Sequence, residues 1–450
     1  MLAAVTSFLL SRPPIALAAL LALCLAAAPA LAASDDLSPP DESALRATVG
    51  AELLARVALE RNPGLRAVER RASATDMRAD AESRMPAPEA EVLLQRIPVS
   101  KPYDVPGSQM IMLGLRQPIP APGSLSARRD MRSAQSRELR ATVAVMRRQL
   151  AREVEHAFVD YWEARARSVL LRTNKAESDR IAAFAKARYV AGGPLTDQTQ
   201  AEVESAMVGA SIAEQDAKAE AARSRLNALL LRPADAPLGE PAEPANESVA
   251  EPTEALIRRA AALRPEIGLA RTHQATLMAE ANVAEREAQW PAMSVGVFYY
   301  APTRDMPGSG YGASFMSTLP WAWGRASDSA RASHAMSSSA ADDVAEAETQ
   351  VSIEIATYAG AEHAAESRYL ALRDSTLPAS LRAADAASSG YESGRTDVLM
   401  LLSARRAVVD VQSAMLEARA AIQHALVDLD WAAGGRVGRR SLPTFPPTPE

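Results

Sequence analysis

The feature that most constrains this chain is a helical pattern from Ser124 to Ala191 that contains neither glycine nor proline. At 1.5 Å per residue, a helix of this length rises about 100 Å, which no compact globular domain of this size can contain. The composition agrees with long, close-packed helices, because only 4% of the residues are aromatic. The sequence therefore predicts a rod or a tube.

The chain contains an internal duplication, because three landmarks recur about 200 residues apart. Arg61, Asn62 and Pro63 return as Leu263, Arg264 and Pro265; Ile119, Pro120 and Gly123 return as Leu319, Pro320 and Gly324; Tyr189 and Gly192 return as Tyr391 and Gly394. We therefore expect two copies of one structural unit. The expected divisions are a first repeat at 33–231, a linker at 232–253 rich in Pro, Glu and Ala, a second repeat at 254–434 and a Pro-rich tail at 435–450.

Each repeat shows the same order of predicted elements, with short helices, two strands and a long helical hairpin. In the first repeat, helices at 44–60 and 63–85 precede the strands, and the hairpin at 124–231 turns at Gly192 to Pro194. In the second, a helix at 265–290 precedes the strands and the hairpin occupies 325–432. Pro378 should kink this hairpin, because proline removes a backbone donor and crowds the preceding turn.

Four short runs alternate between apolar and more polar residues, as a strand with two different faces does. In the second run, Ile111, Leu113 and Leu115 alternate with Met112, Gly114 and Arg116. Each run has about ten residues, the length that spans a bilayer when the strand is tilted. Four strands cannot close a barrel, and an open edge in lipid leaves backbone groups unpaired, so the chain should oligomerise. The runs lie near 89–97, 109–118, 291–300 and 310–319.

The N-terminus has the features of a secretory signal peptide at 1–32. Arg12 precedes an apolar run at 14–28, and residues 30–32 supply a small-residue cleavage site. The alternative is an uncleaved transmembrane anchor, which would need about 20 apolar residues without such a site. Cys24 is the only cysteine and lies inside the apolar run after a large residue, so we expect no lipid anchor, disulfide or thiol chemistry in the mature chain.

This order of elements, given twice, resembles the TolC family of outer-membrane efflux proteins over nearly the whole mature chain. The most specific matches are the helix entry at Asn62 and Pro63, the strand exit at 117–123, and the hairpin turns at 189–192 and 391–394. The resemblance implies a trimer whose twelve-stranded β-barrel lies in the outer membrane and whose α-helical barrel extends through the periplasm. The expected fold class is therefore mainly α with a small β part, with four strands and two structural repeats per protomer.

The same resemblance places functional residues at the two hairpin turns, which would form the periplasmic tip. An acidic residue near a helix start also has a simpler role, because it interacts favourably with the helix dipole, and glycine after a helix is commonly a C-terminal cap. Met400 and Ser403 occupy the two positions where the family's best-known member carries a ring of aspartates. The candidate adaptor-contact residues are Tyr189, Gly192, Pro194, Tyr391, Gly394, Arg395 and Thr396, and the candidate gate residues are Asp197, Asp397, Met400 and Ser403.

We expect a passive channel without catalysis. No glycine-rich phosphate loop follows a strand, and the five histidines show no metal-ligand spacing. The sequence therefore predicts no enzyme activity, no cofactor and no metal site. The formal charge of −6 is spread without a basic face, so nucleic acid is not an expected partner. The histidines are His156, His273, His334, His363 and His424.

The partners that the resemblance implies are two further copies of the chain, a periplasmic adaptor, an inner-membrane pump and outer-membrane lipid. The proline-rich segment Pro118 to Gly123 most resembles the branch that works with heavy-metal pumps of the resistance-nodulation-division type, although Ser124 replaces a basic residue often found there. Two alternatives stay open: an outer-membrane duct for a type I protein secretion system, and a periplasmic helical-hairpin adaptor that spans no membrane. Adaptors carry one hairpin with flanking β-domains, whereas the hairpin here is duplicated.

Overall fold

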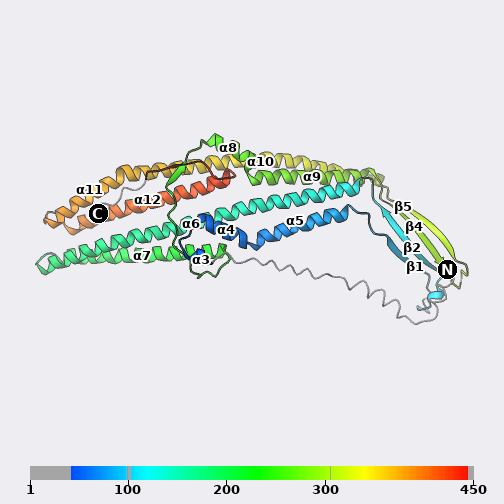
Figure 1. Ribbon diagram of the computed structural model, residues 1–450, viewed down its shortest axis with the longest axis horizontal. Helices are drawn as coiled ribbons and strands as arrows, with labels where there is room; N and C mark the ends of the chain where they lie inside the picture. The colour runs from blue at the N-terminus through cyan, green and yellow to red at the C-terminus, as the bar shows by residue number, and fades with distance from the viewer. Residues whose placement is uncertain (1–41, 98, 100–102, 305, 444–450) are drawn as a thin grey trace. The chain divides into compact units, whose positions relative to one another are not determined.

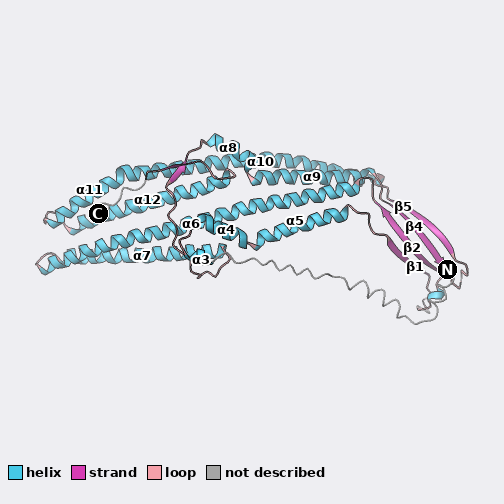
Figure 2. Ribbon diagram, in the orientation of Figure 1, coloured by secondary structure: helices cyan, strands magenta, loops and turns pink. Residues whose placement is uncertain are grey.

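The computed structural model describes residues 42–443, apart from 98, 100–102 and 305. The predicted signal peptide at 1–32 lies outside the described residues. The described residues from 43 onward belong to one structural unit. Within that unit, long helices connect a four-stranded sheet to two hairpin turns (Figure 1). The expectation of a mainly α fold with a small β part is confirmed (Figure 2).

The first repeat begins with α3 (Glu42–Arg46) and α4 (Ala51–Arg61), where the sequence predicted one continuous helix. That prediction was wrong at Val49, whose backbone bonds to the linker instead. The Val49 N–H donates to the Glu240 carbonyl at 3.0 Å, and the Val49 carbonyl accepts from the Ala242 N–H at 2.8 Å. Backbone groups that are bonded to the linker cannot also serve a helix, so the helix divides here.

Three long helices follow in the first repeat: α5 (Pro63–Glu82), α6 (Ser124–Val190) and α7 (Leu195–Leu229). Asn62 caps α5, because its side-chain oxygen accepts a hydrogen bond from the Leu65 N–H at 3.1 Å. The helix α6 has 67 residues and lies beside α5, α7 and α9. It is therefore the continuous rod against which the shorter helices pack.

The second repeat has the same order but an interrupted long helix. A π-helical turn, η3 (Leu372–Thr376), separates α10 from α11 directly before Pro378. Proline supplies no N–H and its ring crowds the preceding turn, and a π-helical turn is one way to accommodate both effects. The α-helices are α8 (Thr253–Leu263), α9 (Pro265–Gln289), α10 (Arg325–Ala371), α11 (Leu377–Glu392) and α12 (Val398–Ala432).

The two repeats share one antiparallel sheet with the strand order β1-β2-β4-β5. The central pair β2 and β4 joins the repeats, with Leu113 opposite Tyr299. The outer edges of β1 and β5 have no strand partner among the described residues. The strands are β1 (Glu89–Gln95), β2 (Met110–Ile119), β4 (Met293–Ala301) and β5 (Gly310–Ser317), and the short 3-10 helices η1 (Val105–Gly107) and η2 (Ala322–Gly324) lie in the connections.

A second, two-stranded sheet pairs the linker with the C-terminal tail. The strand β3 (Glu247–Val249) runs antiparallel to β6 (Arg439–Ser441). Glu362 of α10 supports this pair, because its Oε1 accepts from the Val249 N–H at 3.1 Å. The sequence indicated only a linker and a tail here, since strands of three residues are too short to show a period of two.

Each repeat has its own apolar core near the middle of the helices. The first core gathers side chains from α4, α6 and α7, including Leu54, Phe158 and Leu226. The second gathers side chains from α8, α10 and α12, including Leu256 and Ile422. Among the described residues, no helix is long and apolar enough to cross a membrane.

Candidate functional site at the hairpin turns

Both hairpin turns have the same backbone conformation. Gly192 and Gly394 adopt positive φ angles of 96° and 73°, which residues with a side chain rarely adopt. In the first turn the Gly193 N–H donates to the Arg188 carbonyl at 2.9 Å, and in the second the Arg395 N–H donates to the Gly390 carbonyl at 2.8 Å. These six-residue bonds satisfy the last carbonyls of each helix, so both glycines act as C-terminal caps.

The two turns lie against each other around a shared apolar cluster. Side chains from both repeats contribute to it, including Ile181 and Ala185 of α6, Ala201 of α7 and Leu401 and Leu402 of α12. The ion pairs of Arg406 with Glu204 and of Arg405 with Glu177, the latter at 3.5 Å, also join α12 to the first repeat. The tips are therefore held together within one protomer.

Tyr391 lies at the centre of this cluster and is only 1% exposed. Its hydroxyl donates to Asp197 Oδ2 at 3.4 Å, and its ring packs edge-on against Phe184 with centroids 5.7 Å apart. The Arg188 guanidinium lies 4.7 Å from the ring centroid. Burial, together with the negative charge of Asp197, raises the pKa of Tyr391, so its hydroxyl stays protonated and able to donate.

The duplicated tyrosines are not equivalent in the structure. Tyr189, the counterpart of Tyr391 in the first repeat, is 44% exposed, while Tyr391 is buried. The Tyr391 side chain therefore does not belong to the outer surface on which the sequence placed it. Among the other predicted contact residues, Gly192, Pro194, Gly394 and Arg395 are exposed.

The acidic gate candidates differ from each other in the same way. Asp197 is 8% exposed and faces Tyr391 inside the protomer. Asp397 is exposed and caps α12, because its Oδ1 accepts from the Met400 N–H at 3.0 Å. Met400 is exposed, and the exposed Ser403 hydroxyl donates back to the Met400 carbonyl at 2.9 Å. The structure thus leaves Met400 and Ser403 on the surface of the tip.

Thr396 has a packing role that the sequence did not indicate. Its N–H donates to the Gly390 carbonyl at 3.3 Å, and a Cβ added at Gly390 would lie 2.8 Å from Thr396 Oγ1. Gly390 is therefore required by the close approach of the chain at 396. The two residues are only six positions apart, but no local period marks the contact.

At the other end of the helices, the sheet presents one face of exposed apolar side chains. A row of residues crosses all four strands, because Val92 pairs with Leu113, Leu113 with Tyr299, and Tyr299 with Tyr311. Val92, Leu113 and Tyr311 are exposed. An apolar row of this kind fits a surface that faces lipid.

The opposite face of the sheet is filled in a different manner. Arg116 Nη2 lies 2.7 Å from Glu91 Oε2 across the β1–β2 pair. Phe298 is buried and covers Gly114 and Gly296, where an added Cβ would lie 2.3 Å and 3.1 Å from its ring. The sequence indicated a more polar face here and did not identify Phe298 as the side chain that fills the space above the two glycines.

Comparisons with known proteins agree on the fold. The family model described as outer membrane efflux protein matches residues 54–230. No curated protein matches the chain by sequence. The solved outer-membrane channel OprN superposes with a TM-score of 0.66 at 22% identity, covering 86% of this chain and 90% of that chain. VceC, an outer membrane protein from Vibrio cholerae, gives 0.69 at 17% identity, covering 86% and 96%, and CusC gives 0.71 at 16% identity, covering 89% and 96%.

The chain has the fold of the outer membrane efflux protein family. The structural match extends beyond the residues of the family model, so both repeats of this efflux-protein fold take part. Within it, the residues that sequence reasoning missed at the tips are Phe184, Arg188, Glu204 and Arg406. Their partners lie about 200 residues away in the chain, and no local pattern connects residues at that separation. In the part of the chain that is described, no cluster of three or more ligating side chains could hold a metal ion.

Proposed function

We propose that this chain is one protomer of a passive outer-membrane channel in an efflux system. The observation that carries the proposal is the four-stranded sheet at the end of long helices in an efflux-protein fold. One face of the sheet is apolar and exposed, and its two edges have no strand partner among the residues that the structure describes. In lipid, the open edges of β1 and β5 would each leave a row of backbone groups unpaired. Closing the sheet with further copies of the chain removes both edges.

The closed assembly is a trimer in this proposal. Three copies of a four-stranded sheet form a barrel of twelve strands, which is within the range of outer-membrane barrels. The barrel lies in the outer membrane, and the helices extend into the periplasm. The solved relatives include proteins described as outer-membrane channels, OprN and MtrE of Neisseria gonorrhoeae among them. The work of transport comes from a partner pump, and the chain supplies an aqueous path without catalysis.

The tip of the helices is the proposed entrance and docking surface. Tyr189, Pro194 and Arg395 are exposed beside the capping glycines, where a periplasmic adaptor would contact the turns. The adaptor connects the channel to an inner-membrane pump of the resistance-nodulation-division type. The buried contact between Tyr391 and Asp197 holds the two hairpins of a protomer together and so favours the closed entrance.

The test is single-channel conductance of the protein extracted from the outer-membrane fraction and reconstituted in a planar bilayer. Wild type is compared with Met400→Ala/Ser403→Ala, which shortens two exposed side chains at the tip. The matched control is Met336→Ala/Ser339→Ala, an exposed pair with the same spacing on α10. We expect small steps for wild type and control, and larger steps for the tip variant.

The outcomes distinguish the efflux channel from the two alternative functions. Protein that stays in the soluble periplasmic fraction and never conducts would contradict the channel and favour a periplasmic adaptor. A duct for protein secretion would conduct in the same way. A strain that lacks the gene distinguishes the two ducts. If the chain serves protein secretion, the strain would fail to export a protein, whereas the loss of an efflux channel would make it accumulate a small compound.

A further inference from the structure

Two histidines from different repeats meet where α6 contacts α12. The rings of His156 and His424 lie nearly parallel and meet edge to edge, with centroids 4.9 Å apart and an interplanar angle of 17°. Their Nδ1 atoms lie 2.6 Å apart, which is hydrogen-bond distance. The side chains are 23% and 28% exposed, so protons from solvent can reach them.

The outer nitrogen of each ring faces a carboxylate. His156 Nε2 lies 2.7 Å from Asp428 Oδ1, and His424 Nε2 lies 3.1 Å from Asp160 Oδ1. The hydrogen bond from His424 is the main cause that lowers the pKa of Asp160. Burial alone would raise the pKa of Asp428, but His156 and Arg152 outweigh it and lower that pKa. Both carboxylates are therefore ionised near neutral pH and act only as acceptors.

The number of protons on the pair follows from these contacts. An ionised carboxylate accepts only, so each Nε2 must carry a hydrogen. The contact between the two Nδ1 atoms needs one donor and one acceptor, so only one of them carries a hydrogen. The four ring nitrogens of His156 and His424 therefore hold three protons in this arrangement. The pair has a net charge of +1, with one imidazolium and one neutral imidazole that share the central proton.

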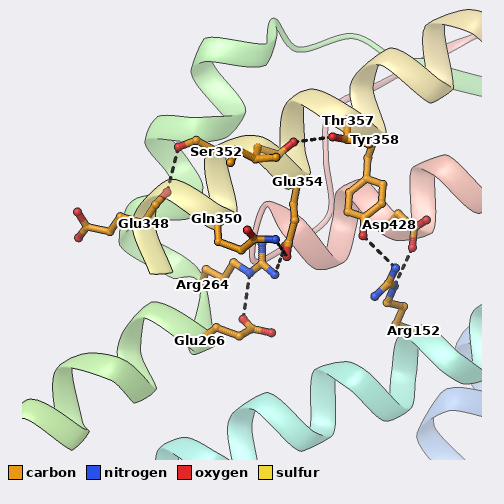
Figure 3. A network of polar contacts seen from close by, with 11 residues as sticks. Arg152, Arg264, Glu266, Glu348, Gln350, Ser352, Glu354, Thr357, Tyr358 and Asp428 are labelled. Carbon is orange, nitrogen blue, oxygen red and sulfur yellow. Dashed lines mark hydrogen bonds and ion pairs between the residues drawn. The ribbon is translucent and has the colours of Figure 1, made fainter. Parts of the chain in front are cut away.

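Neighbouring elements supply further charges around the pair. On one side, Arg152 of α6 lies 2.7 Å from Asp428 and donates to the Tyr358 hydroxyl of α10 at 3.2 Å (Figure 3). On the other, Arg225 of α7 lies 3.3 Å from Asp160. The positive charges of the two arginines offset the negative charges of the two aspartates. The aspartates therefore do not fully neutralise the +1 charge of the histidine pair. Two further carboxylates, Glu155 and Glu163 of α6, interact with the histidines at longer range, and burial raises the pKa of both. Glu417 of α12 adds to the rise at Glu163.

We propose that His156 and His424 form a proton-sharing joint that holds the two repeats together only while the pair carries three protons. A fourth proton, taken from solvent, would place two N–H groups against each other and two positive charges on adjoining rings. Loss of the shared proton would leave two lone pairs facing each other at the same distance. Either change breaks the central hydrogen bond and loosens the contact between α6 and α12.

The joint therefore has a pH optimum, because it weakens on both sides of the three-proton state. Histidine is the side chain whose charge ordinarily changes between about pH 5 and 8, so the experiment has to cover that range. This inference concerns the contact between the repeats and does not depend on the proposed channel function.

The experiment measures thermal unfolding and amide hydrogen exchange of the purified full-chain assembly in detergent, from pH 4.5 to 9. Wild type is compared with His156→Gln/His424→Gln, which keeps polar side chains but removes the titration. The control is His334→Gln, an exposed histidine on α10 that lies 3.7 Å from Glu285. We expect wild type and control to show a maximum in Tm and in protection of α6 and α12 that the double variant lacks.

A second variant separates the proton-sharing role from a merely structural one. Asp428→Asn keeps the shape and an acceptor oxygen but removes the negative charge that favours the protonated pair. Its alkaline limit should move to lower pH by about 1 unit, the effect of removing a neighbouring opposite charge. Wild-type and double-variant profiles that differ only by a constant, or an alkaline limit that stays in place in Asp428→Asn, would overturn the proposal.

Discussion

The hydroxyl of Tyr391 donates to Asp197 at 3.4 Å, although 194 residues separate the two in the chain. The bond connects the hairpin of the second repeat with that of the first, inside a cluster of buried apolar side chains. It joins a predicted contact residue, Tyr391, to a predicted gate residue, Asp197. The candidate adaptor-contact residues and the candidate gate residues are therefore in direct contact here.

Tyr391→Phe should open the tip while keeping its packing. The ring stays against Phe184, but Asp197 loses its hydroxyl partner in a buried position, which costs about 1–3 kcal/mol. We expect larger or more frequent conductance steps in planar bilayers. Tyr189→Phe is the matched control, because the Tyr189 side chain is exposed. This variant should conduct like wild type. Equal conductance for both variants and wild type would contradict the role of the Tyr391 hydroxyl.

Gly390→Ala should destabilise the second hairpin turn. The added Cβ would lie 2.8 Å from Thr396 Oγ1, so the turn has to shift, and a loss of about 1–3 kcal/mol is typical of overpacking. Gly360→Ala is the control in the same repeat, since a Cβ added there meets no neighbouring atom within 4 Å. This change should raise helix stability by up to about 1 kcal/mol. Thermal unfolding checks both, and the prediction fails if Gly390→Ala melts at or above the wild-type temperature.

Gly114→Val should disrupt the four-stranded sheet. Its Cβ would lie 2.3 Å from the Phe298 ring, which is buried above this glycine. We expect less protein in the outer-membrane fraction and fewer oligomers on unboiled gels. Gly310→Val gives the comparison, because the nearest atom to a Cβ there is 3.8 Å away. The double variant Gly114→Val/Phe298→Ala should recover part of the loss, and no recovery would argue against this clash as the cause.

Glu362→Gln should stabilise the protein at neutral pH. Burial raises the pKa of Glu362 above its ordinary value, so folding favours the protonated form and ionisation lowers stability. This loss is absent at pH values below the unfolded pKa, near 4.5, and develops as the pH rises towards the folded pKa. Glutamine keeps the acceptor for the Val249 N–H. Tm of the variant should exceed that of wild type at pH 7 and approach it at low pH; a constant difference would contradict the explanation.

Local patterns in the sequence were sufficient for the regular elements. The helix predicted from 124 to 191 corresponds to α6, which runs from Ser124 to Val190. Asn62 and Pro63 mark the start of α5, and the glycines at 192 and 394 mark the two turns. Each of these features depends on residues within a few positions of one another. Period, capping and breaking signals act over that range, so they can be read directly along the chain.

The internal duplication also predicted how the elements are organised. Two copies of one pattern predicted two hairpins and the four strands of the larger sheet, and these are present. The same argument failed where the copies differ in their surroundings, because it treated Tyr189 and Tyr391 as equal. Tyr391 meets a carboxylate and an aromatic ring from the other repeat, whereas Tyr189 is 44% exposed.

The sequence by itself therefore determined the long helices, the strand faces, the turns and the repeat. Only the tertiary structure decided which side chains meet across the repeats: Tyr391 with Asp197, His156 with His424, and the linker strand β3 with β6 in the tail. Such contacts join residues about 190 to 270 positions apart, and they depend on how the helices pack. The energy of a helix or strand is encoded in successive residues, whereas the partners of a buried polar group are set by whichever distant elements exclude water around it.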